Sequence, residues 1–312
     1  MIGRLALVVS ALLLGCKSAS DEAKQSSPPP ETHDAPPIET RVNADSAWTA
    51  LTTQLEFGPR VPGTESHRRC GDWLVSELKR YGAQVEEDTW SYSDTATTTW
   101  PLRNILGHLG PAGNGRLLLV AHWDTRPWAD EDPDPKRWNQ PIPGASDGGS
   151  GVAVLLEVAR VLEGETLPRG VDILFADGED LGRRGNPEGY CRGTRRFAER
   201  PLTAYWRGIV LDLVGDIDLH LKIEQYSLAR APEVVDWIWQ RGAALAPDVF
   251  SQEMGTAIID DHIPLLDAGL PTVDVIDFEY GPWHTHADDV GAVSAASLVA
   301  VARVVASLAQ TP

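Results

Sequence analysis

The sequence is poor in cysteine, in basic residues and in long apolar runs. Its three cysteines include no CxxC pair, so it offers no support for a cysteine zinc site or a thiol redox motif. Against 45 aspartates and glutamates there are only 27 lysines and arginines, a formal net charge of −18. This charge argues against nucleic acid as a partner, because phosphate binding needs a positive face. The apolar run near the N-terminus spans about ten residues, too few to cross a bilayer.

The first 45 residues are expected to lie outside the folded domain. Residues 1–15 resemble a bacterial lipoprotein signal peptide, with one basic residue, an apolar run and a Leu-Leu-Gly-Cys box that marks Cys16 for lipidation. A plain secretory signal with an incidental cysteine is the alternative. Residues 16–45 are rich in proline, serine and charge, which predicts a disordered tether. We expect an exported lipoprotein of the periplasm or cell envelope, anchored to the membrane only through Cys16.

Residues 46–312 alternate between apolar runs and amphipathic stretches. The apolar runs predict strands at residues 102–109, 116–121, 171–176, 208–214 and 271–276. The amphipathic stretches predict helices at residues 64–81, 151–162, 232–245 and 294–308. This alternation predicts a single α/β domain with a central, mostly parallel mixed β-sheet flanked by helices. Cys70 and Cys191 lie within it, and the sequence leaves open whether they pair.

Acidic residues and histidines follow the predicted strands, where open α/β sheets bind ligands. They are His122, Asp124, Asp147, Asp177, Glu179, Asp180, Asp212, Asp260, Asp261, His262 and His284. Each alone is commonly a helix cap or a hydrogen-bonded polar residue. Together they form a nitrogen and oxygen donor set that predicts zinc, with manganese or cobalt as alternatives. In the pair Glu179-Asp180, we assign Asp180 to the metal and Glu179 to proton transfer.

Five segments carry a family resemblance. In chain order, AHWDTRPW, PGASDGGSGVA, DGED, DDHIP and WHT resemble the zinc aminopeptidase superfamily, and within it the glutaminyl cyclases (glutaminyl-peptide cyclotransferases). The resemblance covers about residues 46–310 and implies a zinc-aminopeptidase-like fold with one zinc ion. It implies these site residues: Asp147, Asp180 and His284 as zinc ligands, Glu179 as catalytic acid/base, Asp260 and Asp212 as hydrogen-bonding acids, and Trp283 against the substrate.

The implied reaction converts the N-terminal glutamine of a peptide or protein into pyroglutamate with release of ammonia. The α-amine attacks the γ-carboxamide carbon of the same residue, so orientation supplies much of the rate enhancement. The chain departs from the animal cyclases at Asp274, where they carry histidine, and lacks their tryptophan after the acidic pair. In both respects it is similar to the bacterial, animal-like cyclases. The second wall of the substrate pocket stays open among Tyr190, Phe197, Trp123, Trp128 and Trp138.

Two alternatives remain from the sequence. A two-zinc aminopeptidase would use a bridging water and five ligands, which are His122, Asp147, Asp180, Asp212 and His284. Trp283 and the doubled acid Asp260-Asp261 favour the cyclase over it. The other alternative is a non-catalytic surface protein that keeps the fold for binding. His286, Asp288 and Asp289 are expected to lie in a solvated loop.

Overall fold

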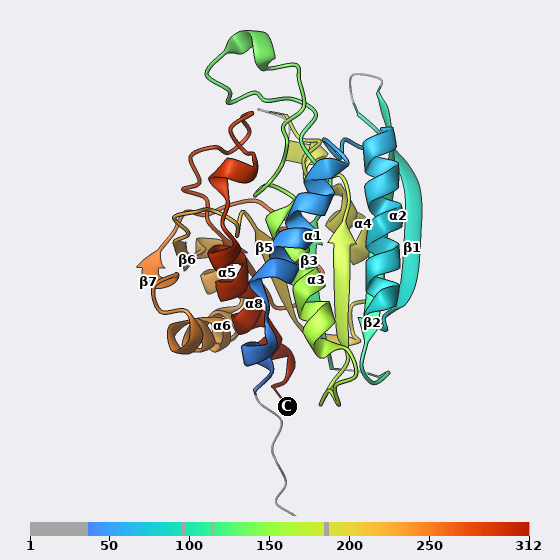
Figure 1. Cartoon of the computed structure of the whole chain (residues 1–312). Coiled ribbons are helices and arrows are strands. Elements are labelled where there is room, and N and C mark those ends of the chain that lie inside the picture. Colours follow the sequence, from blue (N-terminus) through green and yellow to red (C-terminus); the bar gives the residue numbers. More distant parts are fainter. Residues whose placement is uncertain (1–36, 95–97, 114, 184–186, 312) are drawn as a thin grey trace, which may run out of the picture. The chain divides into compact units, whose positions relative to one another are not determined.

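A six-stranded sheet forms the centre of the folded domain (Figure 1). The structure is a computed structural model that describes residues 37–311 except 95–97, 114 and 184–186. The expected signal peptide, Cys16 and residues 16–36 of the expected tether lie outside the described residues. Within the described part, no helix is both long and apolar enough to span a membrane.

The sheet is mixed and mostly parallel, as predicted. Its order is β1-β2-β4-β3-β5-β8, with β1, β2 and β4 antiparallel to one another in turn and β4, β3, β5 and β8 parallel. The strands are β1 Gln84–Ser93, β2 Thr99–Leu109, β3 Arg116–His122, β4 Val171–Ala176, β5 Tyr205–Asp212 and β8 Thr272–Ile276. A separate two-stranded sheet pairs β6 Leu221–Ile223 with β7 Phe250–Met254.

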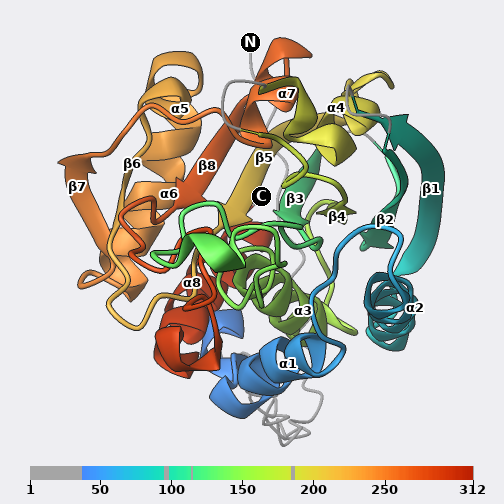
Figure 2. The ribbon, with the colours of Figure 1, turned by 90° about the horizontal axis from the view of Figure 1, so that it is seen from above.

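Helices cover both faces of the central sheet (Figure 2). On one face lie α1 Ala44–Glu56, α2 Glu65–Arg80, α3 Ser150–Leu162 and α8 Ala295–Ala309, with α6 Pro232–Leu245 against α8. On the other lie α4 Arg192–Ala198 and α7 His262–Asp267, and α5 Gln225–Arg230 contacts α6 and β8. Short 3-10 helices occupy Ile38–Arg41, Pro135–Arg137, Pro187–Gly189 and Val290–Ala292. The four predicted helices and five predicted strands are all present, with small shifts at their ends.

The continuous apolar runs reflect burial on both sides of the sheet. In β3, Leu117 and Leu119 pack into the core beneath α1, α3 and α8, whereas Leu118 and Val120 pack into the core beneath α4 and α7. Side chains alternate between the two faces of a strand, so a strand covered on both sides is apolar at nearly every position.

The folded domain begins earlier than Ser46, which corrects the predicted tether boundary. Ile38 and Val42 are buried in the core, and Asn43 caps α1 by accepting a hydrogen bond from the Ser46 amide. These two isolated apolar residues stand among prolines and charges, so local composition did not reveal that they pack. The open question on the cysteines is also answered, because Cys70 and Cys191 are both buried free thiols.

Candidate functional site

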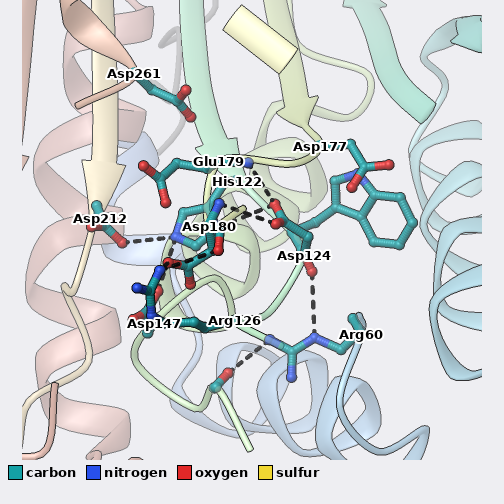
Figure 3. A network of polar contacts seen from close by, with 12 residues as sticks. Arg60, His122, Asp124, Arg126, Asp147, Asp177, Glu179, Asp180, Asp212 and Asp261 are labelled. Atoms are coloured by element: carbon teal, nitrogen blue, oxygen red, sulfur yellow. Dashed lines mark hydrogen bonds and ion pairs between the residues drawn. The ribbon is translucent and has the colours of Figure 1, made fainter. Parts of the chain in front are cut away.

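The carboxyl edge of the parallel strands gathers the predicted site residues. His122 ends β3, the segment after β4 carries Glu179 and Asp180, and Asp212 ends β5. The turn before α3 adds Asp147 and the loop after β8 adds His284, and Figure 3 shows His122, Asp147, Asp180 and Asp212 converging on one another. A pocket of about 380 Å³ opens here. Its lining includes Asp147, Glu179, Tyr190, Asp212, Asp260, Phe278, Trp283 and His284.

Asp147, Asp180 and His284 form a buried trio with free ligand atoms. Nε2 of His284 lies 3.3 Å from Oδ1 of Asp180 and 3.7 Å from Oδ2 of Asp147. The Oδ2 atoms of both aspartates are buried without a hydrogen-bond partner among the described residues. Unpaired buried carboxylate oxygens are costly, and a divalent cation satisfies them. One imidazole and two carboxylates are a donor set that zinc accepts, so these residues fit a zinc ion.

The two aspartates of this trio differ in their pKa values. Burial and the neighbouring Asp180 charge raise the pKa of Asp147 well above its usual range. Burial alone would also raise the pKa of Asp180, but the hydrogen bond with His284 and the charges of His284 and Arg126 hold it well below its usual range. Asp180 therefore carries the negative charge of the pair before a cation binds.

Asp124, which the sequence placed in the candidate donor set, and Arg126, which it did not single out, hold Asp180 in place. The carboxylate of Asp124 accepts hydrogen bonds from the Glu179 and Asp180 amides at 3.1 and 3.2 Å. Arg126 is buried and donates to the carbonyl oxygen and Oδ1 of Asp180, both at 3.2 Å, and it also pairs with Asp130. With Oδ1 occupied by Arg126, Oδ2 is the oxygen of Asp180 left for a metal.

Asp288 corrects the expectation of a solvated loop. It is fully buried, and its carboxylate accepts from the Ser146 and Asp147 amides at 2.7 and 3.2 Å and from the Tyr280 hydroxyl at 2.7 Å. Asp288 thereby fixes the turn that carries Asp147. His286 is also mostly covered, since its ring bonds to buried Asp132 at 2.8 Å. Asp289 is exposed, as expected.

The glycine after Asp147 is required by the tightness of this turn. Gly148 has φ +76°, and a Cβ at this position would stand 2.3 Å from the Asp124 carbonyl oxygen. His284 also adopts a left-handed backbone conformation, with φ +56°. Such conformations cost about 1–2 kcal/mol for a residue with a side chain. The candidate ligand is therefore held in an unfavourable conformation by its surroundings, as is common at functional sites.

His122 lies beside the trio and joins it to Asp212. Its Nε2 lies 3.2 Å from Oδ1 of Asp147 and 3.2 Å from Oδ1 of Asp212. Burial would lower the pKa of His122, but hydrogen bonds to Asp124, Asp147 and Asp212 raise it well above its usual value. His122, Asp147 and Asp212 are also close enough to hold a metal ion together. The ligands of a two-metal site are thus all assembled.

Glu179 and Asp260 are the remaining acids of the pocket. Burial, and then the charges of Asp180 and Asp260, raise the pKa of Glu179 well above its usual range. The Cys191 thiol approaches its Oε1 at 3.6 Å. Burial and the nearby Asp212 raise the pKa of Asp260 to about 6. Raised pKa values of this kind suit groups that exchange protons near neutral pH.

Aromatic side chains form the walls of the pocket. The ring of Trp283 stacks on that of His284, with centroids 3.7 Å apart and planes 23° apart. Tyr190 is the only one of the five second-wall candidates that lines this pocket in the described part of the chain. The other four lie elsewhere: Trp123 stacks on His67, Trp128 packs against Arg183, Phe197 of α4 lies in the core, and Trp138 is 44% exposed.

Fold and site together are those of the zinc-exopeptidase class of α/β proteins. The chain belongs to peptidase family M28, whose family model matches residues 104–309. Among solved structures it is similar to Porphyromonas gingivalis glutaminyl cyclase, with 41% identity, 86% of this chain and 97% of that chain covered, and a TM-score of 0.82. It is also similar to a zinc-dependent exopeptidase from Parabacteroides distasonis, with 36% identity, coverage of 87% and 99%, and a TM-score of 0.83.

The curated relatives agree with the first of these structures. The glutaminyl-peptide cyclotransferase of Drosophila melanogaster is 25% identical over 269 residues, which cover 77% of this chain and 73% of the relative. The resemblance to glutaminyl cyclases stated from the sequence is thereby confirmed, and so is the zinc-aminopeptidase-like fold.

Proposed function

We propose that this chain is a zinc-dependent glutaminyl-peptide cyclotransferase that converts N-terminal glutamine to pyroglutamate and releases ammonia. The observation that carries the proposal is the stacking of Trp283 on His284 in the lining of a pocket that also contains Glu179. A flat ring beside the metal trio leaves room for a substrate side chain only in a compact, folded conformation. The similarity to glutaminyl cyclases supports the same reaction.

Asp147, Asp180 and His284 would hold one zinc ion. When bound, the zinc would act as a Lewis acid on the substrate γ-carbonyl. Glu179 would take the proton that the α-amine loses as its nitrogen bonds to the γ-carbon. It would then deliver that proton to the γ-nitrogen, whose bond to carbon breaks as ammonia leaves. The raised pKa of Glu179 suits a carboxyl that both accepts and returns a proton.

The other pocket residues would orient the substrate. Asp260, with Asp212 beside it, would accept hydrogen bonds from the amide nitrogen as its bonding changes. Trp283 would press the glutamine side chain toward the α-amine, and Tyr190 would supply the second wall. Holding the two reacting atoms together is the larger part of the task, because the nucleophile belongs to the substrate itself.

A two-zinc aminopeptidase is the second candidate, favoured by the closeness of His122 and Asp212 to Asp147. The similar zinc-dependent exopeptidase supports it as well. Against it, the buried carboxylate oxygens without a partner next to His284 belong to Asp147 and Asp180, which are both ligands of the one-zinc trio.

Metal analysis and paired assays separate the two candidates. Purified protein is expected to contain one zinc per chain and to release ammonia from a peptide that begins with glutamine, with no cleavage of aminoacyl-anilides. A matched peptide that begins with asparagine serves as the control, because its side chain is one methylene too short for the five-membered ring. Two zinc ions per chain and anilide cleavage without ammonia release would instead identify the aminopeptidase.

We also infer that the enzyme is an exported lipoprotein of the cell envelope. The support is the signal-like residues 1–15 and the box ending at Cys16. Substituting Cys16→Ser is expected to move the enzyme from the membrane fraction to the soluble exported fraction. Unchanged membrane association of that variant would contradict the lipid anchor.

A further inference from the structure

Asp260 also belongs to a second buried group of polar side chains, whose other members do not line the pocket. We call Asp260, His262, Asp274 and Glu224 the rear cluster. His262 begins α7, Asp274 lies in β8, and Glu224 caps α5. None of the four is more than 4% exposed. Only Asp260 lines the pocket.

Asp274 has an unusual environment for a buried aspartate. Both of its carboxylate oxygens lack a hydrogen-bond donor, and no arginine or lysine pairs with it in the described part of the chain. Asp124 and Asp288 are equally buried, but each accepts at least two backbone N–H groups. A buried carboxylate without donors is strongly disfavoured in its ionised form. The surroundings of Asp274 therefore fit an uncharged carboxylic acid.

The charges around Asp274 lead to the same result. Glu224 accepts three backbone N–H groups at 2.5 to 3.0 Å, and although burial opposes ionisation, these bonds and His262 lower the pKa of Glu224 to about 2. His262 lies between the two acids, with Nε2 3.3 Å from Glu224 and Nδ1 3.4 Å from Asp274. Burial and the charges of Asp260, Asp212 and Glu224 raise the pKa of Asp274 well above its usual range.

A proton on Asp274 needs an acceptor, and Asp260 provides it. The ligand atoms of Asp260, His262 and Asp274 lie within 4.8 Å of one another. Oδ1 of Asp260 accepts the Asp261 amide at 2.5 Å, while its Oδ2 has no partner. We propose that Asp274 is a neutral carboxylic acid that donates its proton to Asp260 in a hydrogen bond and so positions the Asp260 carboxylate at the pocket.

The consequence for catalysis rests on the proposed function. Asp260, anchored from behind by a neutral donor, keeps its charge and its orientation toward the substrate amide nitrogen. Asp274 is thus a positioning residue that contacts no substrate. Asp274 contributes a hydrogen-bond donor, so another neutral side chain of the same shape that also donates a hydrogen bond should replace it.

Asp274→Asn tests this directly, because an amide keeps the shape and a donor but cannot ionise. Its kcat for a glutamine peptide is expected to stay within about threefold of the wild-type value, with KM unchanged. The infrared difference spectrum between wild type and variant at about pH 8, where a free carboxyl is ionised, should show loss of one carbonyl band of a protonated carboxylic acid. Asp267→Asn on the exposed end of α7 is the matched control and should remove no such band.

Three results would overturn the proposal. The first is a difference spectrum in which no protonated carboxyl disappears. The second is a folded, zinc-loaded Asp274→Asn variant whose kcat falls about a hundredfold or more, since the negative charge would then be essential. The third is loss of one bound metal ion per chain, which would make the rear cluster a metal site.

If Asp274→Asn does not fold, Asp274→Thr provides the same test, because threonine keeps a neutral donor and suits a buried strand. The infrared measurement does not depend on turnover. A wild-type protein that releases no ammonia would therefore contradict the proposed function, while the spectrum would still decide whether Asp274 holds a proton.

Discussion

Asp180 and Asp274 are both buried aspartates near the carboxyl edge of the sheet, yet their pKa values shift in opposite directions. Asp180 accepts a hydrogen bond from Arg126 and lies beside His284, so its negative charge is stabilised despite burial. Asp274 receives no donor from the described residues and lies among other acids. Two aspartates that are similarly buried therefore have different charge states. Asp180 is an anion on the metal side of the pocket, and Asp274 is a neutral acid in the rear cluster.

This difference separates two tasks. A metal ligand must keep one oxygen free, as Asp147 and Asp180 do with Oδ2, and it must be ionised when the metal is bound. Asp180 is already ionised, whereas the raised pKa of Asp147 means that Asp147 gives up its proton as the cation binds. In the rear cluster, the proton on Asp274 lets Asp274 and Asp260 lie close together without a cation. Glu179 lies where the two sides meet, with Asp180 and Asp260 as its strongest charged neighbours.

Substitution of Glu179 should have the largest effect. Glu179→Gln keeps the shape but cannot carry the proton, so kcat is expected to fall by about 10³-fold or more, within the upper range for general acid–base groups. Zinc content should stay near the wild-type value, because Asp147, Asp180 and His284 are untouched. Steady-state ammonia release and metal analysis measure the two quantities.

Exposed Glu188 supplies the matched control for this variant. It belongs to the same segment after β4, and Glu188→Gln should leave both quantities unchanged. Full activity in Glu179→Gln would remove Glu179 from the reaction. Loss of zinc together with activity would show that it serves the metal side of the pocket.

The central sheet and the edge that carries the site could be predicted, because strands buried on both faces appear in the sequence as continuous apolar runs. The run at residues 117–121, for example, has no polar position until the strand ends at His122, and the polar residues that follow are those of the site. Strand β1 was missed because it lies at the sheet edge and is polar, with no residue fully buried. The short helices α4, α5 and α7 have too few turns for a visible periodicity.

The supporting residues could not be predicted from the sequence. Asp288 accepts the amide of Asp147, which lies 141 residues earlier in the chain, and Arg126 reaches Asp180 across 54 residues. Neither contact leaves a local pattern. The neutral state of Asp274 depends on donors that are absent, which only the assembled fold reveals. The types of ligand residue and the ends of the strands can therefore be predicted from the sequence, whereas the charge states of buried residues follow only from the packed structure.

In the rear cluster, Asp260→Asn should stabilise the zinc-free protein at neutral and higher pH. The pKa of Asp260 is about 6 in the fold against 3.8 for a free aspartate, so the folded state binds more protons than the unfolded state between these values. The free energy of unfolding therefore falls as pH rises through this window. Two units correspond to about 3 kcal/mol at most, and asparagine avoids this cost.

Urea unfolding of the zinc-free wild type and variant at several pH values measures this difference. The stabilisation by Asp260→Asn should be full above about pH 6 and vanish below about pH 4. Asp267→Asn, which removes an exposed carboxylate, should show no such pH-dependent gain. A variant that is less stable than wild type at high pH would mean that the Asp260 charge is well satisfied in the fold.

On the metal side, Asp288→Asn should have the smallest of the three effects. One amide oxygen can still accept the Ser146 amide, but the new NH₂ group would face the Asp147 amide, donor against donor. The turn carrying Asp147 should then shift, and zinc affinity should weaken by about tenfold, at the low end for residues that orient a metal ligand.

Competition with a chelator measures this affinity, and exposed Asp289→Asn, one residue further along, is the control that should leave it unchanged. The outcome also bears on the contrast between the two sides of the pocket. If Asp288→Asn left zinc affinity intact, the turn would not need its carboxylate anchor, and the free oxygen of Asp147 alone would define the metal side. A tenfold loss of both activity and zinc affinity would instead show that the metal side depends on a buried carboxylate, that of Asp288, held by hydrogen-bond donors. Asp274 has no such donors.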